Sequence, residues 1–295
     1  MTRQESQASS QLLAAGRRHA RAVPAPGTKI TAMPRGDLAV IIPARNEADR
    51  IAATVRAAGK LSGADIIVVV DDGSTDDTAA LAASAGAHVI RHPRNRGKAA
   101  AMETGAEAAR LIEASRLAES DAAEAGPAGT RHLLFLDADL ADSAADAGPL
   151  ADPVRAGTAD MTIAVFTTRV RLGGFGTVTA AAGAGIERAT GWRPAQPLNG
   201  QRCLTRAAFT AALPLAGGWG AETGMTIDLL RKGMRVAEVA VPLSHRATGT
   251  DWRSQLHRLH QLADVCRALV VREPAFSRLR THPALRPGGS ANRRT

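Results

Sequence analysis

Two carboxylates separated by a single residue follow directly on a hydrophobic run. The run covers residues 133–136, and Asp137, Ala138 and Asp139 come immediately after it. Unpaired carboxylates at the end of a buried strand would repel each other and would be costly to remove from water. A divalent cation that bridges them to phosphate oxygens removes this cost, and Mg²⁺ or Mn²⁺ prefers such oxygen ligands. The pattern predicts a metal-dependent phosphate site, with a helix-capping acid pair as the alternative.

A second acidic cluster follows the five consecutive β-branched residues at 66–70. Asp71 and Asp72 come first, and Ser74 follows two positions later. Acids and hydroxyls at a strand end can accept hydrogen bonds from the N–H of a base or from a ribose hydroxyl. A helix N-cap would explain the segment 74–76 alone, but it would not explain two adjacent acids at the end of a buried strand. The cluster therefore favours a nucleoside site.

A glycine and a lysine open a long alanine-rich segment. Gly97 allows the backbone to approach a ligand, the N-terminus of a helix favours anions, and Lys98 adds a mobile positive charge. This combination suits a diphosphate. Taken alone, it is equally compatible with an ordinary basic loop.

Two later polar residues have both a functional and a structural interpretation. Glu222 opens a predicted helix, where the helix dipole alone would favour a carboxylate, but it could also contact a sugar hydroxyl or act as a general base. His245 stands beside Arg246 after a predicted strand, and it is a candidate metal ligand only because the chain already holds the acid pair at 137–139.

The elements that must position these residues alternate between strand and helix. Such alternation predicts an α/β fold with a largely parallel, doubly wound sheet, in which ligands sit beyond the carboxyl ends of the strands. The predicted strands are 38–42, 66–70, 87–90, 132–136 and 161–166, and the predicted helices are 48–61, 76–84, 98–118 and 146–156. The second half is less regular, with a turn at 173–176, a helix at 219–232, one or two strands within 235–246 and a helix at 251–271.

Composition excludes several classes of protein. The chain has 295 residues and is 45% hydrophobic, which suits a globular domain with a sizeable core. With no Tyr, five Phe and three Trp, it lacks the rings of a stacking platform, so we expect no nucleic-acid partner. No apolar run approaches the ~20 residues of a membrane span, and no secretory signal is visible. Cys203 and Cys266 are far apart and predict reduced thiols in a cytoplasmic protein.

The positive charge of the chain is concentrated at its two ends. The net charge is +9, yet residues 37–266 are slightly acidic. We expect residues 1–36 to be a disordered leader and 273–295 to be a basic tail. Basic ends aid solubility, and they could also touch an anionic lipid surface.

In their order, these motifs resemble glycosyltransferase family 2 of the GT-A fold. The resemblance rests on four segments, 40–47, 70–76, 97–98 and 137–139. The later segments 199–202, 219–222 and 244–246 resemble an actinobacterial branch near polyprenyl-phosphate sugar transferases and glucosyl-3-phosphoglycerate synthase.

The resemblance implies roles for individual residues. Residues 37–165 would be the nucleotide-sugar-binding half and 166–272 the acceptor-binding half of one GT-A domain. The donor would be held by Pro43, Ala44, Glu47, Asp71, Asp72, Ser74, Lys98, Asp137 and Ala138. Mg²⁺ or Mn²⁺ would be bound by Asp137, Asp139 and His245, with Asp139 the more direct ligand. Catalysis would fall to Asp139, Glu222 and Lys98, and acceptor contacts to Gly176, Thr177, Arg202 and Arg246.

The acceptor and the stereochemistry stay open at this point. The synthase has an arginine after its acceptor loop, where this chain has Gly176 and Thr177, so phosphoglycerate loses the natural clamp for its carboxylate. Polyprenyl phosphate or another phosphorylated molecule would need no general base, whereas a hydroxyl acceptor in an inverting reaction would need one, for which Glu222 is the candidate. Inversion is the family expectation and retention is the outcome of the synthase. A homodimer and peripheral contact with the inner face of the membrane are compatible with the sequence.

Other classes fit less well. A dinucleotide dehydrogenase would need GxGxxG after the first strand, where residues 43–47 read Pro-Ala-Arg-Asn-Glu. A sugar-phosphate nucleotidyltransferase would need a Gly-rich, Arg-containing loop there. A phosphatase with an aspartate nucleophile expects Thr or Val at the position of Ala141. A non-catalytic nucleotide-sugar-binding protein remains the alternative from a different class.

Overall fold

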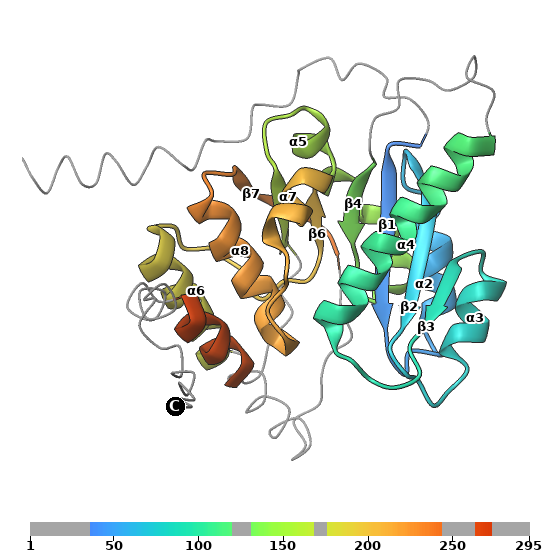
Figure 1. The fold of residues 1–295 in the computed structure, drawn as a ribbon, viewed down its shortest axis with the longest axis horizontal. Helices are drawn as coiled ribbons and strands as arrows, with labels where there is room; N and C mark the ends of the chain where they lie inside the picture. Colours follow the sequence, from blue (N-terminus) through green and yellow to red (C-terminus); the bar gives the residue numbers. More distant parts are fainter. Residues whose placement is uncertain (1–35, 120–130, 168–175, 244–262, 273–295) are drawn as a thin grey trace, which may run out of the picture.

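The computed structural model describes residues 36–119, 131–167, 176–243 and 263–272, which form one mixed sheet flanked by helices (Figure 1). The sheet has the strand order β3-β2-β1-β4-β6-β5-β7. Neighbouring strands are parallel except where β6 pairs, because β6 runs antiparallel to both β4 and β5. The strands are β1 (Leu38–Ala44), β2 (Ala64–Asp71), β3 (His88–Arg91), β4 (His132–Phe135), β5 (Met161–Phe166), β6 (Arg202–Leu204) and β7 (Val236–Val241).

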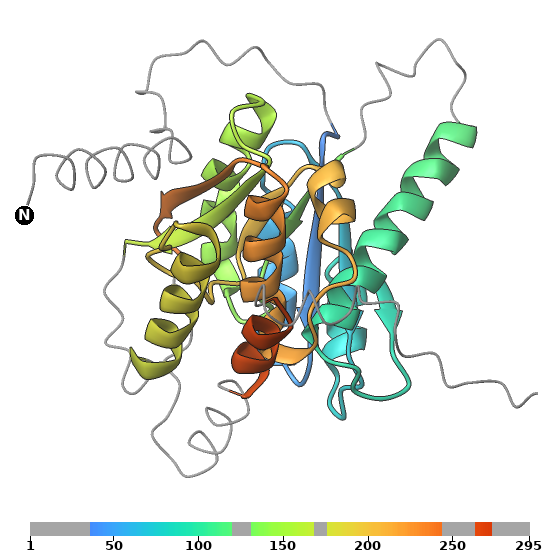
Figure 2. The same cartoon turned by 60° about the vertical axis from the view of Figure 1, so that its left-hand side comes forward.

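Helices cover both faces of this sheet. One face packs against α2, α3, η1 and α5, and the other against α4, α7 and α8. A further helix at 263–272 lies beside α6, where Val265 packs against Val178 and Ala182 (Figure 2). The helices are α2 (Ile51–Ala58), α3 (Thr78–Ser84), α4 (Lys98–Glu119), η1 (Ala141–Leu150), α5 (Asp152–Arg155), α6 (Gly176–Thr190), α7 (Arg206–Ala212), η2 (Gly218–Gly220) and α8 (Ala221–Arg231).

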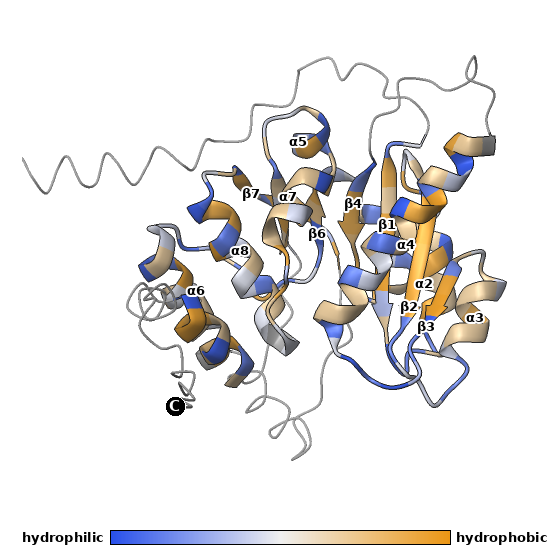
Figure 3. Cartoon of the chain, in the orientation of Figure 1, coloured by the Kyte–Doolittle hydropathy of each residue, from blue (hydrophilic) through white to orange (hydrophobic). Residues whose placement is uncertain are grey.

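The central strands are apolar on both sides because both sides are covered. In β1, Val40 and Ile42 face the α2 side, whereas Ala39 and Ile41 face the α4 side, and all four are fully buried. Figure 3 shows mostly hydrophobic strands in the centre of the sheet and hydrophilic loops at their lower ends. The polar side chains therefore gather where the strands end.

Close packing brings the start of α4 to this edge. A side chain on Gly105 would collide with Ile41, so glycine allows α4 to lie tightly over β1. The small alanines of α4 serve the same purpose along the helix, and Ala101, Ala106 and Ala109 are all buried. Lys98, the first residue of α4, is thereby held beside the carboxyl ends of the strands.

The predicted α/β class and the mostly parallel sheet are confirmed, but some elements differ. The helix expected at 146–156 is a 3-10 helix, η1, followed by the single turn α5, since Pro149 and Pro153 interrupt a regular helix. The elements α6, β6 and α7 were not predicted. Of the helix expected at 251–271, the structure describes residues 263–272, which are helical. The expected leader up to residue 35 and the basic tail lie outside the described residues.

Candidate active site

The carboxyl ends of β1, β2 and β4 meet at the lower edge of the sheet in Figure 1. Parallel strands deliver their following loops to one side, so the segments after Ala44, Asp71 and Phe135 become neighbours. The predicted donor residues and the predicted metal ligands Asp137 and Asp139 lie at the ends of these strands, in the loops that follow them, or at the first residue of α4. Topology alone brings them together from distant parts of the sequence.

Lys98 lies between two carboxylates. Its Nζ is 2.7 Å from Oδ1 of Asp137, which follows β4, and 2.9 Å from Oε1 of Glu222, in the first turn of α8. The Glu222 side chain is only 2% exposed, whereas Asp137 keeps 26% exposed. Burial by itself would lower the pKa of Lys98, but the two carboxylates outweigh it and raise this pKa above its ordinary value. Lys98 therefore supplies a lasting positive charge between two acids that were both predicted as site residues.

A glycine and a glutamine complete this cluster. Gln201 is fully buried, and its Nε2 donates to Oδ2 of Asp137 at 2.7 Å. Its Oε1 is buried and has no hydrogen-bond partner among the described residues. A side chain on Gly200 would collide with Nζ of Lys98 and with the Asp137 carboxylate. Sequence reasoning did not select Gln201, and the available signal was a polar side chain directly after a glycine.

The structure corrects the prediction for Arg202. Its side chain is completely buried, and its Nη1 donates to the carbonyl of Glu222 at 3.0 Å and to Oγ1 of Thr226 at 2.8 Å. Its Nη2 donates to the carbonyl of Pro197 at 3.0 Å, and burial lowers its pKa to about 10. Arg202 joins the 197–201 loop to α8, so it holds the site together from inside and has no surface to offer an acceptor.

Hydrogen bonds tie the loops after β1 and β2 to each other. The N–H of Asn46 donates to Oγ of Ser74 at 2.9 Å, and the N–H of Thr75 donates to Oδ1 of Asn46 at 2.9 Å. Asn46 has a φ of 55°, a conformation that asparagine tolerates better than most residues. Asp71 accepts from the N–H of Ser74 at 2.8 Å. The loops that carry the predicted donor residues Asp71 and Ser74 thus form a fixed rim beside Pro43 and Ala44.

The segment 74–76 contributes to the start of α3 through its last residue. Oδ1 of Asp76 accepts from the N–H of Thr78 at 3.1 Å, whereas the Ser74 hydroxyl is bonded to Asn46. Hydrogen bonds from Thr78 hold the pKa of Asp76 below its ordinary value. The N–H of Glu47 donates to Oγ1 of Thr78 at 2.8 Å, which places Glu47 against the same turn.

Asp72 fixes the loop that leads into α4. Its Oδ1 accepts from Nδ1 of His92 at 2.7 Å and from the N–H of Arg96 at 2.8 Å, and its Oδ2 accepts from the N–H of Gly97 at 2.8 Å. Burial alone would raise the pKa of Asp72, but the hydrogen bonds from His92 and the two backbone groups lower it. Because Asp72 is only 5% exposed, its carboxylate binds groups of the protein itself in this structure.

The turn that carries the acid pair is held by α2. Oγ1 of Thr54 donates to the carbonyl of Ala138 at 2.7 Å and accepts from the N–H of Ala141 at 2.8 Å. Nη1 of Arg50 donates to the carbonyl of Asp139 at 3.1 Å. These bonds fix the backbone on both sides of Asp139 and leave its carboxylate half-exposed at the edge of the sheet.

The remaining predicted residues are not brought to the cluster by what the structure describes. His245 and Arg246 lie outside the described residues, and so does the side chain of Thr177. Gly176 begins α6. Within the described ranges, no group of three or more His, Cys, Asp or Glu side chains could by itself hold a metal ion.

The acid pair nevertheless fits a divalent cation. Mg²⁺ keeps several waters and is usually bound through one or two carboxylates together with substrate phosphates, so a complete protein cage is not required. Asp137 and Asp139 supply carboxylate oxygens at a half-exposed strand end. Two carboxylates one residue apart are oxygen donors of the kind that a hard cation prefers.

The described residues include no helix with the length and apolar character that a membrane crossing requires.

Comparisons with known proteins agree with this geometry. A family model described as Glycosyl transferase family 2 matches residues 39–111, which include β1, β2 and the start of α4. Glycosyltransferase AglJ from Haloferax volcanii is 29% identical over 224 residues, which cover 74% of this chain and 67% of that protein. The succinoglycan biosynthesis protein ExoU from Rhizobium meliloti is 44% identical over 77 residues, but these cover only 24% of this chain and 22% of that protein.

Solved structures of a mycobacterial enzyme share the fold. Glucosyl-3-phosphoglycerate synthase from Mycobacterium tuberculosis, in complex with Mn²⁺, uridine diphosphate and phosphoglyceric acid, is 25% identical with a TM-score of 0.60. The likeness covers 81% of this chain and 78% of that one. The same enzyme in complex with phosphoglyceric acid alone is 26% identical with a TM-score of 0.59. The family match over residues 39–111, the relatives and the GT-A sheet together support a nucleotide-sugar glycosyltransferase that is similar to members of glycosyltransferase family 2.

Proposed function

We propose that the protein transfers a hexose from a UDP- or GDP-linked sugar to a phosphorylated acceptor, either a polyprenyl phosphate or a small phosphorylated molecule, with Mg²⁺ or Mn²⁺. Residues 37–165 would hold the donor and residues 166–272 the acceptor. The observation that carries the proposal is the position of Lys98, a protonated lysine at a helix N-terminus that is held between two carboxylates at the carboxyl edge of the sheet. Such a group suits the negative charge that develops on a departing nucleoside diphosphate.

The donor half is supported from two sides. Asp71 and Ser74 form a fixed rim after β1 and β2. In addition, a structural neighbour has been solved with Mn²⁺ and UDP-glucose. Asp139, together with Asp137 and His245, would hold the cation. The cation, when bound, would supply further positive charge to the diphosphate. In this proposal the chain's own contribution is to orient the diphosphate through Lys98 at the N-terminus of α4.

The arrangement of Glu222 favours an acceptor that is already anionic. A hydroxyl acceptor in an inverting reaction would need a general base, and Glu222 was the candidate. In the structure its Oε1 faces Nζ of Lys98 at 2.9 Å, and its side chain is 2% exposed. This geometry supports a role in positioning Lys98. A phosphate acceptor is anionic near neutral pH and needs no base.

A second candidate is a retaining synthase-like reaction with phosphoglycerate. The neighbour solved with phosphoglyceric acid favours it. The absence of an arginine at positions 176–179 speaks against it, since an arginine fork suits a carboxylate. An acceptor assay that includes 3-phosphoglycerate and a polyprenyl phosphate, followed by the anomeric configuration of the product, separates the two reactions. Transfer to a lipid phosphate would also support peripheral action at the inner face of the membrane, through the basic ends.

Calorimetric titration tests the donor half first. UDP, GDP and their glucose and mannose conjugates are titrated with Mn²⁺ and again with EDTA. We expect one nucleotide to bind only with the metal, and Asp139→Ala to weaken this binding at least tenfold because it removes a direct ligand. The matched control is Asp142→Ala, which removes an exposed acid in the same segment. Folded protein that binds none of these nucleotides, or an Asp139→Ala variant with full metal-dependent activity, would contradict the proposal.

A further inference from the structure

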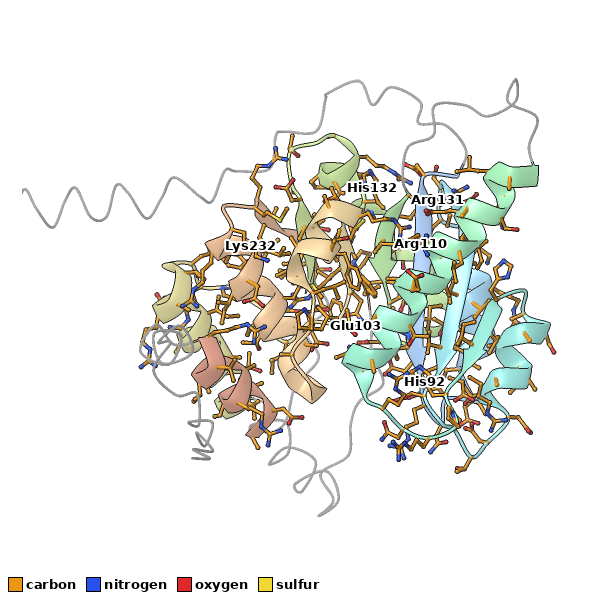
Figure 4. All side chains as sticks on the ribbon, in the orientation of Figure 1. His92, Glu103, Arg110, Arg131, His132 and Lys232 are labelled. Atoms are coloured by element: carbon orange, nitrogen blue, oxygen red, sulfur yellow. The ribbon has the colours of Figure 1, made fainter. Side chains whose placement is uncertain are left out.

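One buried histidine belongs to none of the motifs described above, and it lies next to the loop that follows β2. His92 follows β3 and is 4% exposed. Its Nδ1 is 2.7 Å from Oδ1 of Asp72, and its Nε2 is 3.0 Å from Oγ1 of Thr104 in α4. Figure 4 shows His92 at the lower end of the molecule, at the edge where β1 and β2 end. The imidazole therefore connects the loop after β2 to the helix that begins with Lys98.

Through Asp72, the contact with His92 also fixes the loop that leads into α4. Both of its oxygens accept backbone N–H groups, one from Arg96 and one from Gly97. The backbone on the other side is equally close, because Gly73 has a φ of 73° and a side chain there would meet the backbone of Arg94 and Asn95 at 2.7 Å. The segments 72–74 and 92–97 thus pack as one unit. The hydrogen bonds from the two backbone N–H groups depend on the orientation of the Asp72 carboxylate.

Among the residues that the structure describes, His92 is the side chain that donates a hydrogen bond to this carboxylate. Asp72 is acceptor-only when ionised, so Nδ1 of His92 must carry the proton in this pair. In the neutral imidazole, Nε2 then accepts from the hydroxyl of Thr104. A carboxylate that is 5% exposed has little water to replace a missing donor, so losing His92 would allow Asp72 to turn away from the two amides.

We propose that His92 is a positioning residue for diphosphate binding. Through Asp72 it holds the backbone of residues 96–97, and it thereby sets the position from which Lys98 meets the nucleoside diphosphate. This inference rests on the proposed function for its ligand, but the loop geometry that it predicts can be measured without any ligand.

Three substitutions separate the two contacts of His92. His92→Ala removes both, His92→Asn keeps a donor close to the position of Nδ1, and His92→Gln places its amide near Nε2, toward Thr104. If the bond to Asp72 matters, Asn rescues the loop and Gln does not. The control for a merely structural loss is Thr162→Val, which removes a buried hydroxyl that donates to the carbonyl of Leu150 at 2.6 Å on the far side of the sheet.

Two readouts decide the outcome. Amide hydrogen exchange of the full-length protein without ligand should show faster exchange at Arg96 and Gly97 in His92→Ala and His92→Gln, and wild-type exchange there in His92→Asn and Thr162→Val. Calorimetry with UDP or GDP and Mn²⁺ should show about tenfold weaker binding in His92→Ala and His92→Gln, since a hydrogen bond to a charged group is lost. The KM for the acceptor should stay unchanged.

Unchanged exchange at Arg96 and Gly97 in His92→Ala would overturn the inference, whatever the nucleotide does. Equal weakening of binding by His92→Ala, His92→Asn and Thr162→Val would overturn it as well, because the effect would then be one of general stability. If the wild-type protein binds neither nucleotide while the exchange pattern appears as predicted, the proposed function fails and the loop-positioning role of His92 stands.

Discussion

The two edges of the sheet treat their carboxylates differently. At the amino edge Asp37, Asp65 and Asp160 each pair with arginine. Nε and Nη2 of Arg155 donate to the two oxygens of Asp37 at 2.7 and 2.8 Å. Nε and Nη2 of Arg131 donate to the two oxygens of Asp65 in the same bidentate arrangement. At the carboxyl edge a single lysine, Lys98, faces both Asp137 and Glu222. Figure 4 marks the two edges with Arg131 above and His92 below.

This difference in the pairing of carboxylates indicates which edge of the sheet is suited to binding a ligand. Paired Arg–carboxylate forks satisfy both partners in place and serve the stability of the fold. At the carboxyl edge Lys98 is shared by two acids that the sequence predicted as site residues, whereas at the amino edge Asp37 and Asp65 are each held by an arginine fork. A shared lysine can move toward a bound diphosphate more readily than a forked arginine can leave its carboxylate.

Removal of Lys98 should have the largest effect. Lys98→Met removes the positive charge that lies between Asp137 and Glu222. We expect transfer to fall at least 100-fold, since a charge aimed at the leaving group is lost, and stability to fall by about 3 kcal/mol. Arg155→Met is the matched variant at the other edge, and it should lower stability without changing kcat or KM in the folded fraction. Urea unfolding and transfer kinetics measure both, and equal catalytic losses in the two variants would erase the distinction between the edges.

Gly200 should show a smaller effect that is confined to the carboxyl edge. Gly200→Ala places a methyl group against Nζ of Lys98 and the Asp137 carboxylate, so the pair must separate. We expect transfer to fall about tenfold, because small displacements of aligned groups are costly in catalysis. Gly217→Ala is the control, since a side chain there meets nothing within 4 Å. Steady-state kinetics that do not distinguish the two alanine variants would show that the close approach of Lys98 and Asp137 is not needed.

The sequence predicted which residues lie at this edge better than it predicted what they touch. Strand endings followed by polar clusters placed Asp72, Lys98 and Asp137 together, because parallel strands deliver their loops to one side. The partners of these residues depend on side-chain geometry across the fold. No local pattern could reveal that Glu222 would pair with Lys98, or that His92 would bind Asp72.

Two errors have clear physical causes. The family resemblance assigned Arg202 to acceptor contact, but carbonyl groups of the 197–199 loop and of Glu222 satisfy its guanidinium in the interior. Arginine is almost never fully buried unless it is paired in this way. β6 has three residues, which is too short for any periodicity to show. Its antiparallel pairing places Gln201 next to Asp137, so a missed strand also meant a missed site residue.

The smallest predicted effect concerns an amino-edge pair and pH. Asp160 accepts from Arg235 through its backbone N–H at 2.8 Å and its Nη2 at 2.9 Å, and these hydrogen bonds hold the pKa of Asp160 below its ordinary value. A group whose pKa is lower in the folded state adds stability above its unfolded pKa of about 3.9, and this contribution is lost as the pH falls through the folded value. The Arg235 side chain is 55% exposed, so solvent screening limits the contribution to less than about 1 kcal/mol.

We therefore expect Asp160→Asn to lower the free energy of unfolding slightly at pH 7, to lower it less at pH 3, and to leave nucleotide binding unchanged. Urea unfolding at the two pH values measures the first two effects, and calorimetry measures the third. A loss of nucleotide binding in this variant would mean that the amino edge also takes part in the site, and the contrast between the edges would have to be given up.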